Sequence, residues 1–256
     1  MTKLFFAVLA LCCLTFTLDR YTICSGYHLD SKYNNKSIYI DSLYIPKIDS
    51  SEKLIRHYAY WLVYDETHEQ AKWISYTLSK KRLDGPFKRA NNFKKDPLVL
   101  SGSATHSDYK GSGYDRGHLA PAADMTWSDR AMNESFYYSN MSPQSPSFNR
   151  GIWKKLESRV RKWVLDFDSI YVTTGPILKP NLPSIGNGLS VPASYYKSLI
   201  GFKDGTSTAI AFLLPNEGSK SNLKDFVISI DSLENYSDLD FNSELEKSLQ
   251  DNLEDS

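Results

Sequence analysis

A base-capable histidine, arginines, acids and carboxamides lie between residues 115 and 157, close enough along the chain to form one site. Asp115-Arg116-Gly117-His118 comes first, and Asn140, Asn149 and Glu157 follow. Histidine can take a proton from water at neutral pH, and arginine can bind phosphate through two parallel hydrogen bonds. A carboxamide oxygen suits Mg²⁺, which prefers hard oxygen ligands. These residue types predict metal-assisted cleavage of a phosphodiester.

Structural interpretations of the same residues remain open at this point. Arg116 could form an internal salt bridge with a carboxylate, Asn149 could cap a helix, and Glu157 could pair with Arg161 on a helix surface. A fully helical path from Asn149 to Glu157 would separate them by about 12 Å. The two can therefore serve one metal ion only if Asn149 lies before the helix and the chain turns back there.

The residues just before the histidine predict a turn. Gly111 and Gly113 indicate a tight turn or a close backbone approach, and Asp115 could then orient the histidine ring or hold local backbone. His106 and Asp108 form a His-x-Asp pair, but two ligands make a poor closed metal site. A polar loop is the preferred interpretation of that pair.

The elements that must position these residues are predicted to be an antiparallel sheet and a few helices. Aromatic and β-branched runs predict strands, the first two of them a hairpin, at residues 58–64, 71–78, 169–174, 195–202 and 208–214. Apolar residues at helical spacing, opposite a Lys and Arg face, predict a helix at 152–164. A helix with Ser128 as its cap is expected at 128–138, and the tail from residue 222 is expected to be helical. Together these elements predict one α+β domain.

Charge is unevenly distributed along the 256 residues, although the formal net charge is zero. Residues 231–256 hold nine acidic residues and one lysine, which leaves 29 basic and 21 acidic residues, a net of +8, in the rest. A basic body with an acidic tail is compatible with a phosphate-rich partner and equally with an ordinary solvated surface. All three cysteines lie within residues 12–24, so the body has no disulfide framework and no thiolate zinc site.

The N-terminus has the pattern of a targeting segment. Lys3 precedes an apolar run from Leu4 to Leu18, interrupted only by two threonines and too short for a spanning helix of about 20 residues. The pattern predicts a signal peptide over residues 1–24 and a secreted or periplasmic protein. A retained membrane anchor is the lesser alternative. An N-terminal arm would cover 25–50, and the catalytic domain with its acidic tail 51–256.

The motifs resemble those of the DNA/RNA non-specific endonuclease family, the endonuclease G-like nucleases. The resemblance rests on the run Asp108-Tyr109-Lys110-Gly111-Ser112-Gly113-Tyr114-Asp115-Arg116-Gly117-His118-Leu119-Ala120. It rests also on Ser139-Asn140-Met141-Ser142-Pro143-Gln144, Phe148-Asn149-Arg150-Gly151-Ile152-Trp153 and Leu156-Glu157 at matching spacing. The specific part covers about residues 105–163, and weaker similarity runs from Tyr58 to about Leu233.

The resemblance implies a ββα-metal fold, a central antiparallel sheet flanked by helices, and a Mg²⁺-dependent endonuclease in which Mn²⁺ can substitute. His118 is similar to the family's general base, Asn149 to its metal ligand, and Glu157 to the residue that orients water on the metal. Further members of the predicted site are Arg116 near the scissile phosphate, Asn140 as a support, and Arg89 and Arg150 as substrate-binding arginines.

DNA and RNA are the implied substrates, cut to 5′-phosphate and 3′-hydroxyl ends. A non-catalytic nucleic-acid-binding surface protein is the rival from another class, and a phosphodiesterase acting on small nucleotides is a third interpretation. The sequence indicates no cofactor protein. It leaves open a homodimer and an inhibitor protein.

Overall fold

Two aromatic-rich strands form a hairpin within the central sheet. β2 (Tyr60–Asp65) and β3 (Gln70–Leu78) pair antiparallel, as their composition predicts, with Glu69 at φ 56° in the turn. The computed structural model describes residue 40 and residues 42–243. These residues belong to one compact unit, and the predicted signal peptide lies outside them.

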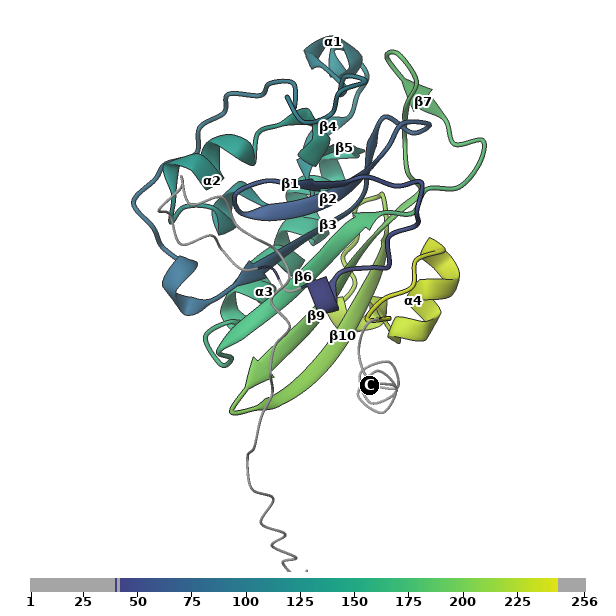
Figure 1. Cartoon of the computed structure of the whole chain (residues 1–256). Helices are drawn as coiled ribbons and strands as arrows, with labels where there is room; N and C mark the ends of the chain where they lie inside the picture. The colour runs from purple at the N-terminus through teal and green to yellow at the C-terminus, as the bar shows by residue number, and fades with distance from the viewer. Residues whose placement is uncertain (1–39, 41, 244–256) are drawn as a thin grey trace, which may run out of the picture. The chain divides into compact units, whose positions relative to one another are not determined.

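The hairpin is part of a seven-stranded antiparallel sheet in the described chain, ordered β1-β2-β3-β6-β9-β10-β11 (Figure 1). The other strands are β1 (Leu54–Arg56), β6 (Ser169–Pro176), β9 (Ser194–Lys203), β10 (Thr206–Pro215) and β11 (Val227–Ile228). Asp204 and Gly205 take positive φ between β9 and β10. The predicted central antiparallel sheet of an α+β fold is confirmed, while the short β1 and β11 were not predicted.

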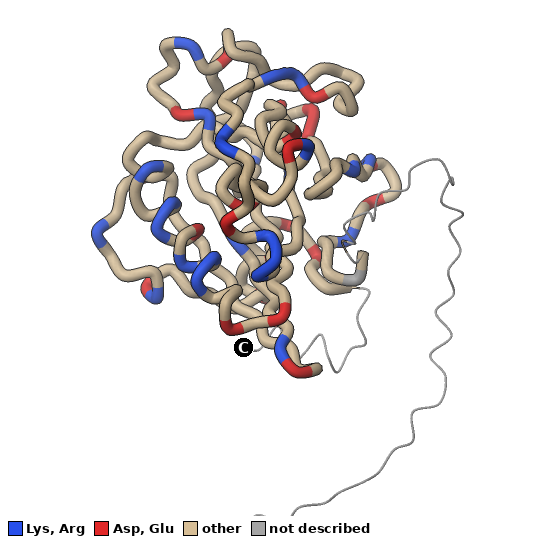
Figure 2. The backbone as a smooth tube through the Cα atoms, turned by 90° about the vertical axis from the view of Figure 1, so that its left-hand side faces the viewer, with Lys and Arg blue, Asp and Glu red and all other residues tan. Residues whose placement is uncertain are grey.

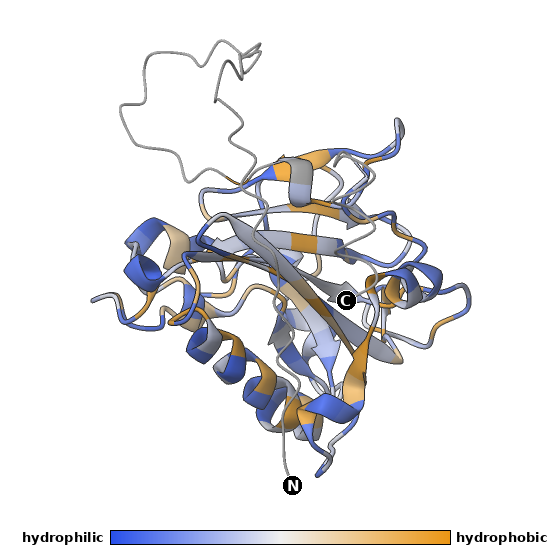
Figure 3. Cartoon of the chain, turned by 90° about the horizontal axis from the view of Figure 1, so that it is seen from below, coloured by the Kyte–Doolittle hydropathy of each residue, from blue (hydrophilic) through white to orange (hydrophobic). Residues whose placement is uncertain are grey.

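Each face of the sheet is covered by a helix (Figure 1). α3 (Lys154–Trp163) packs against one face, where Leu156 shares a core cluster with Tyr195 and Leu199 of β9. α4 (Ile230–Ser237) packs against the other, where Leu233 shares a cluster with alternate residues of the same strand. This follows from the two-residue period of a strand. Seen from below, the hydrophobic side of α3 faces the sheet (Figure 3), as its amphipathic spacing predicts.

The residues before 51 contribute to this unit. Ile40 and Ile45 are buried in the same cluster as α4, and a short 3-10 helix, Ser42–Tyr44, lies between them. Part of the segment expected to be an N-terminal arm therefore packs into this unit, while the division into 1–24, 25–50 and 51–256 stays a prediction.

The histidine motif forms a small two-stranded sheet that was not predicted. β4 (Asp115–His118) pairs antiparallel with β5 (Met141–Gln144). A Cβ on Gly117 would lie 2.1 Å from the side chain of Gln144, so glycine is required where the two strands meet. Gly111 and Gly113 have φ of 73° and 84°, and the turn predicted for them is confirmed.

The predicted helix at 152–164 begins two residues late because the chain is irregular before it. Residues Phe148–Trp153 form a π-helical turn that contains Gly151 in a non-helical conformation (φ −104°, ψ −109°), and α3 follows. Asn149 therefore lies before the regular helix, which meets the first part of the condition for it to act together with Glu157.

The predicted helix at 128–138 is shorter than expected. Ser128 caps it as predicted by accepting from the backbone N–H of Ala131, but α2 covers only Asp129–Glu134. The carboxamide of Asn140 then donates to the backbone carbonyl of Ser135 at 2.7 Å and occupies an acceptor that a longer helix would use.

The remaining elements are short. They are the helical turns Lys80–Arg82, His106–Tyr109 (α1), Ala122–Asp124, Tyr138–Asn140 and Leu223–Phe226, and the strands Ser184–Ile185 (β7) and Leu189–Ser190 (β8). The tail expected to be wholly helical from 222 contains β11 between two helical segments. Among the described residues, no helix has the length and apolarity needed to cross a membrane.

Candidate active site

His118 ends β4 in a buried, aromatic environment. Its ring is 8% exposed, meets Phe136 edge-on at 4.9 Å between centroids, and lies 5.9 Å from Phe93. Its Nε2 has no hydrogen-bond partner among the described residues. Burial, followed by the charges of Arg89 and Arg116, lowers its pKa to about 3. The imidazole is therefore neutral at physiological pH, the form that a general base needs, although the same burial weakens it as a base.

Arg116 lies on the same side of β4 as His118, because residues two apart on a strand share a face. Its guanidinium stacks over the Phe93 ring at 3.9 Å and approaches Nδ1 of His106 at 3.4 Å. None of the salt bridges among the described residues involves Arg116. The alternative of an internal salt bridge is therefore not realised, and the guanidinium remains available to an anion.

Asp115 does not orient the histidine; it holds Asn149 and Arg150 instead. Asn149 Nδ2 donates to Asp115 Oδ2 at 2.9 Å, and Arg150 donates to both carboxylate oxygens at 2.8 and 2.6 Å. These contacts lower the Asp115 pKa despite the opposing effect of burial. Arg150 was expected to bind substrate, but here its guanidinium is engaged by this carboxylate.

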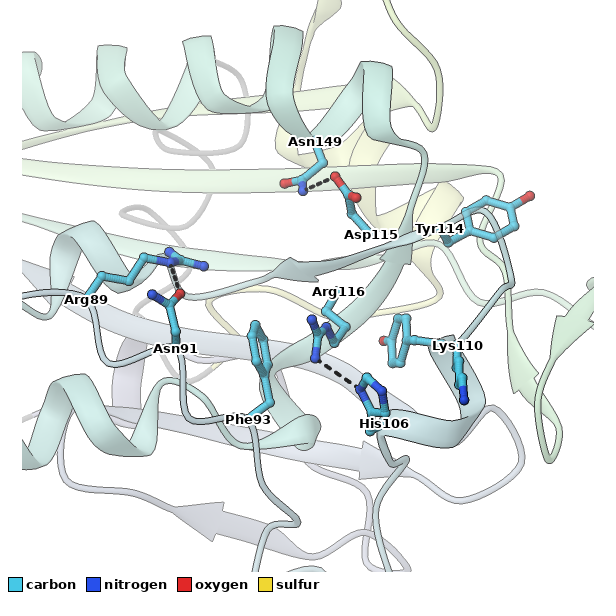
Figure 4. Close-up of a pocket in the computed structure, with 10 residues that line it drawn as sticks. Arg89, Asn91, Phe93, His106, Lys110, Tyr114, Asp115, Arg116 and Asn149 are labelled. Atoms are coloured by element: carbon cyan, nitrogen blue, oxygen red, sulfur yellow. Dashed lines mark hydrogen bonds between the residues drawn. The ribbon is translucent and has the colours of Figure 1, made fainter.

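Some of these residues, but not His118 or Arg150, line a pocket of about 370 Å³ (Figure 4). Asp115, Arg116 and Asn149 line it together with Arg89 from the irregular basic segment. His106 and Tyr109 of α1 close one side. The lining carries several cations and one already paired carboxylate, so the pocket favours an anionic ligand.

Glu157 lies on α3, with a half-buried side chain, near a second group of charges that includes Asp124, Arg161 and Lys197. Burial raises its pKa to about 7, Lys197 and Arg161 oppose the rise, and Asp124 adds to it. The alternative surface pair with Arg161 is not formed, since Arg161 donates to Asp124 at 2.8 Å. No hydrogen bond or ion pair links Glu157 to another described residue, so its oxygens are free to accept from water.

The charge of Arg89 acts on both His118 and Glu157. Its positive charge lowers the pKa of His118 and also that of Glu157. Its Nε donates to Asn91 at 2.9 Å, and its guanidinium lies over the Phe136 ring at 4.9 Å. The sequence placed Arg89 in a loosely aligned basic segment, and the fold brings it to the pocket.

Asn140 supports the site from within the core. It is completely buried; its carboxamide accepts from the Ala120 backbone N–H at 2.8 Å and donates to the Ala120 carbonyl at 2.9 Å. With the bond to Ser135, both ends of the carboxamide are used inside the protein. Asn140 therefore fixes the chain that leaves His118 and has no free polar atom for substrate.

The chemistry of Asn149 fits a hard divalent cation. A carboxylate only accepts hydrogen bonds, so Asp115 engages the amide nitrogen of Asn149 and leaves the carbonyl oxygen toward the pocket (Figure 4). Within the described residues, no three His, Cys, Asp or Glu side chains gather to hold a metal ion. A cation here would take one protein oxygen and several waters, as Mg²⁺ commonly does.

The His106–Asp108 pair is structural, but it lies in the helical turn α1 and not in the polar loop that was preferred. Asp108 accepts from the backbone and hydroxyl of Thr105 in a capping box at the start of α1, and from the backbone N–H of Asn187. His106 faces Arg116. The two side chains serve different contacts and do not form a metal site.

Three residues that contribute to the candidate site were not predicted from the sequence: Phe93, Asp124 and Lys197. Phe93 packs against both Arg116 and His118, and nothing in the irregular segment around it indicated this. Asp124 and Lys197 form the charge group around Glu157. A signal for Lys197 existed, because it is a lysine within an apolar strand, where an unpaired charge is rarely tolerated.

Several curated proteins are similar to this chain. A zebrafish (Danio rerio) mitochondrial nuclease EXOG is 36% identical over 204 residues, which cover 73% of this chain and 60% of that protein. Human mitochondrial endonuclease G is 35% identical over 199 residues, covering 72% of this chain and 67% of that protein. A fungal nuclease C1 from Cunninghamella echinulata is 35% identical over 208 residues, which cover 74% of this chain and 82% of that protein. The chain thus spans about three fifths of the zebrafish relative.

The structure is similar to that of endonuclease G in a crystal structure of the EndoG/EndoGI complex that describes EndoG inhibition. The TM-score is 0.72 at 27% identity, over 82% of this chain and 91% of that one. The expected ββα-metal nuclease fold is confirmed by this likeness.

The predicted secreted or periplasmic location is wrong. The zebrafish and human relatives, and a nuclease of Schizosaccharomyces pombe that is 31% identical over 245 residues, are named as mitochondrial proteins. Lys3 and the apolar run after it define a hydrophobic N-terminal segment, and hydrophobicity alone does not identify a compartment.

The family model for DNA/RNA non-specific endonucleases matches residues 43–248. That range includes the histidine motif, the asparagines and the glutamate of the pocket region. The predicted family is confirmed, and this chain belongs to the DNA/RNA non-specific endonuclease family.

Proposed function

We propose that this protein is a Mg²⁺-dependent endonuclease that hydrolyses DNA and RNA without reading sequence. The observation that carries the proposal is the neutral His118 beside Arg116, next to a cationic pocket into which Asn149 presents its oxygen. A binding protein needs the cations but neither the neutral base nor the oxygen ligand.

His118 takes the proton from the attacking water, since burial keeps its ring neutral. Arg116 and Arg89 face the pocket with guanidinium groups and neutralise the charge that builds up on the phosphate. Glu157 accepts a hydrogen bond from water near the reacting group and orients that water. Asn149 would hold the magnesium ion, which supplies charge neutralisation at the phosphate and at the leaving 3′ oxygen.

Both nucleic acids serve as substrates in this scheme, because no step uses a 2′-hydroxyl. Attack by water with departure of the 3′ oxygen leaves 5′-phosphate and 3′-hydroxyl ends. The basic outer face of α3 extends the cationic surface beyond the pocket; blue Lys and Arg positions mark this helix in Figure 2. Its exposed cations are Lys154, Lys155, Arg159 and Lys162.

The deciding experiment is degradation of supercoiled plasmid and of a long RNA, with Mg²⁺ and with a chelator. The proposal expects nicking and then fragments with Mg²⁺, and intact substrate with chelator. DNA retardation without cleavage in both conditions would support the rival, a nucleic-acid-binding protein. Hydrolysis of a mononucleotide phosphodiester, with the polymers left intact, would support the small-substrate interpretation.

A further inference from the structure

Lys197 is a lysine enclosed in the core next to Glu157. It lies in the middle of β9 and is 1% exposed, among the largest fully buried side chains of the described chain. Its ammonium group lies 4.8 Å from the centre of the Trp153 ring, and Nζ has no hydrogen-bond partner among the described residues. Burying an ammonium without a partner is strongly unfavourable unless an opposite charge compensates.

Two carboxylates act on this ammonium, and one of them is already engaged. Asp124 accepts from Arg161 at 2.8 Å and from the hydroxyl of Tyr76 at 2.9 Å. Glu157 has no such partner. It lies on α3, the helix that packs on the side of β9 that Lys197 shares with Tyr195 and Leu199. Its attraction for the Lys197 ammonium is stronger than that of Asp124. The buried cation and the free carboxylate are therefore each other's main compensation.

Burial and the neighbouring charges act in opposite directions on the proton affinity of both groups. Burial lowers the pKa of Lys197 to about 8, while Glu157 and then Asp124 act in the opposite direction. Burial raises the pKa of Glu157 to about 7, and Lys197 is the strongest influence holding it down. The other charged groups acting on Glu157 are Asp124, Arg161 and Arg89.

We infer that Lys197 is a positioning residue for Glu157: a buried counter-cation on β9 that keeps the α3 carboxylate ionised and in place to orient water. The inference rests on the proposed function, in which an ionised Glu157 is needed. Arg161 cannot replace Lys197 in this role, because its guanidinium is bound to Asp124. Arg89 cannot replace it either, since its position at the pocket commits it to substrate.

Removal of the lysine charge should therefore act through the glutamate. Lys197→Met keeps a long unbranched side chain, so packing is largely retained. Without the ammonium, the ionised form of Glu157 loses its strongest stabilising influence and its pKa rises above 7. One pKa unit is a tenfold change in the ratio of ionised to protonated carboxyl. With the Glu157 pKa raised from about 7 by one unit, the ionised fraction at pH 7 falls from about one half to about one eleventh. The variant should therefore lose about five- to sixfold activity near pH 7 and recover most of it near pH 9.

The test uses two readouts on the full chain. The first is the pH–rate profile of plasmid cleavage with Mg²⁺ for wild type, Lys197→Met and Lys203→Met. Lys203 is an exposed lysine at the end of the same strand and serves as the matched control. The expected result is a shift of the acidic limb to higher pH by about one unit in Lys197→Met only, with unchanged DNA affinity. An unshifted limb, or an equal loss of activity at every pH, would overturn the inference.

The second readout does not require activity. The side-chain carboxyl of Glu157 is titrated by ¹³C NMR in metal-free protein, with the resonance assigned by its disappearance in Glu157→Gln. A rise of about one unit in Lys197→Met is expected, and an unchanged midpoint would overturn the inference. If wild type cuts no nucleic acid but the carboxyl midpoint shifts, the proposed function fails and the Lys197–Glu157 coupling stands.

A folding failure of Lys197→Met would also be informative. If Lys197→Met fails to fold because it leaves the Glu157 charge uncompensated, the double variant Lys197→Met/Glu157→Gln should fold, because both charges are then gone. Circular dichroism and thermal unfolding of the single and double variants decide this. If the double variant also fails to fold, Lys197 acts by packing alone and the inference is wrong.

Discussion

Asn149 donates its amide N–H to Oδ2 of Asp115 at 2.9 Å. This bond fixes which end of the carboxamide faces the pocket, because the carboxylate can accept but not donate. Arg150 holds the same carboxylate from the other side with two bonds. The orientation of the proposed metal-binding oxygen is thus set by the Asp115 carboxylate, which the Arg150 guanidinium holds in place.

Asn149→Ala should weaken the response to metal. Loss of the single protein oxygen removes a ligand, so the activity should fall at low Mg²⁺ and partly return at high Mg²⁺ or Mn²⁺. The measurement is a titration of cleavage rate against metal concentration, with Asn235→Ala, an exposed asparagine on α4, as control. An unchanged titration midpoint would mean that Asn149 is not a metal ligand and only shapes the chain before α3.

Asp115→Asn should reduce metal affinity or activity by about 10- to 100-fold, the range typical when the partner of a metal ligand is lost. The substituted carboxamide can donate to Asn149 and no longer forces its oxygen toward the pocket. Arg150 also loses both of its charged acceptors. The same metal titration applies, with the exposed Asp166→Asn as control; activity equal to wild type at all metal concentrations would contradict this role.

His118→Ala should abolish most cleavage while leaving DNA binding intact. Loss of a general base commonly lowers the rate about 10²- to 10⁴-fold, whereas the phosphate-facing arginines remain. Single-turnover cleavage and filter binding separate the two effects, and His68→Ala, a histidine bonded to Ser190 away from the pocket, is the control. Cleavage within about threefold of wild type would remove His118 from the mechanism.

The acidic limb of the pH–rate profile should reflect Glu157 and not His118. His118 has a pKa of about 3 and is neutral at all higher pH values, while Glu157 has a pKa of about 7 and must be ionised to accept from water. Activity should therefore rise with pH through about 7. A limb that lies near pH 3, or full activity at pH 5, would show that the charge state of Glu157 does not limit the rate.

The sequence predicts the long elements well because their patterns are local. The runs that became β2, β3, β6, β9 and β10 have their strand composition within each segment, and α3 has its apolar stripe. The β4–β5 pair was not predicted, because Asp115-Arg116-Gly117-His118 has no alternating apolar residues and its partner lies more than twenty residues later. Strand pairing of this kind depends on tertiary contacts that no local pattern contains.

For the site, motif spacing identified the residues, but their partners needed the fold. Arg150 looked like a substrate contact, and its bond to Asp115 links positions 35 apart. Glu157 looked like a surface partner of Arg161 four residues on, yet the sheet beneath α3 supplies Lys197 and the helical turn Ala122–Asp124 supplies Asp124. Arg150 pairs with Asp115 at the protein surface, whereas the charges around Glu157 lie in the core, where a buried charge takes the partner that the core offers.

Binding to nucleic acid should depend steeply on salt and little on sequence or sugar. The exposed cations on the outer face of α3, with Lys88, Lys94 and Lys95 of the irregular basic segment, can meet phosphates. Phosphate contacts position a duplex without specifying its sequence. Each neutralised phosphate contributes about −0.9 to the slope of log affinity against log salt on B-DNA, so four contacts give about −3.6. A tenfold rise in salt should then weaken binding by more than about a thousandfold.

A salt series with the His118→Ala protein, on DNA and RNA duplexes of unrelated sequence, measures this dependence without cleavage. Lys155→Ala on α3 should reduce the magnitude of the slope by about 0.9 if that lysine contacts a phosphate. Lys47→Ala is the matched control, because Lys47 is exposed and pairs with Asp240, and it should leave the slope unchanged. Equal slopes for wild type and Lys155→Ala would place the substrate away from α3. A strong preference for one sequence would contradict this account of binding, because it requires contacts with base edges, which phosphate-directed lysines do not make.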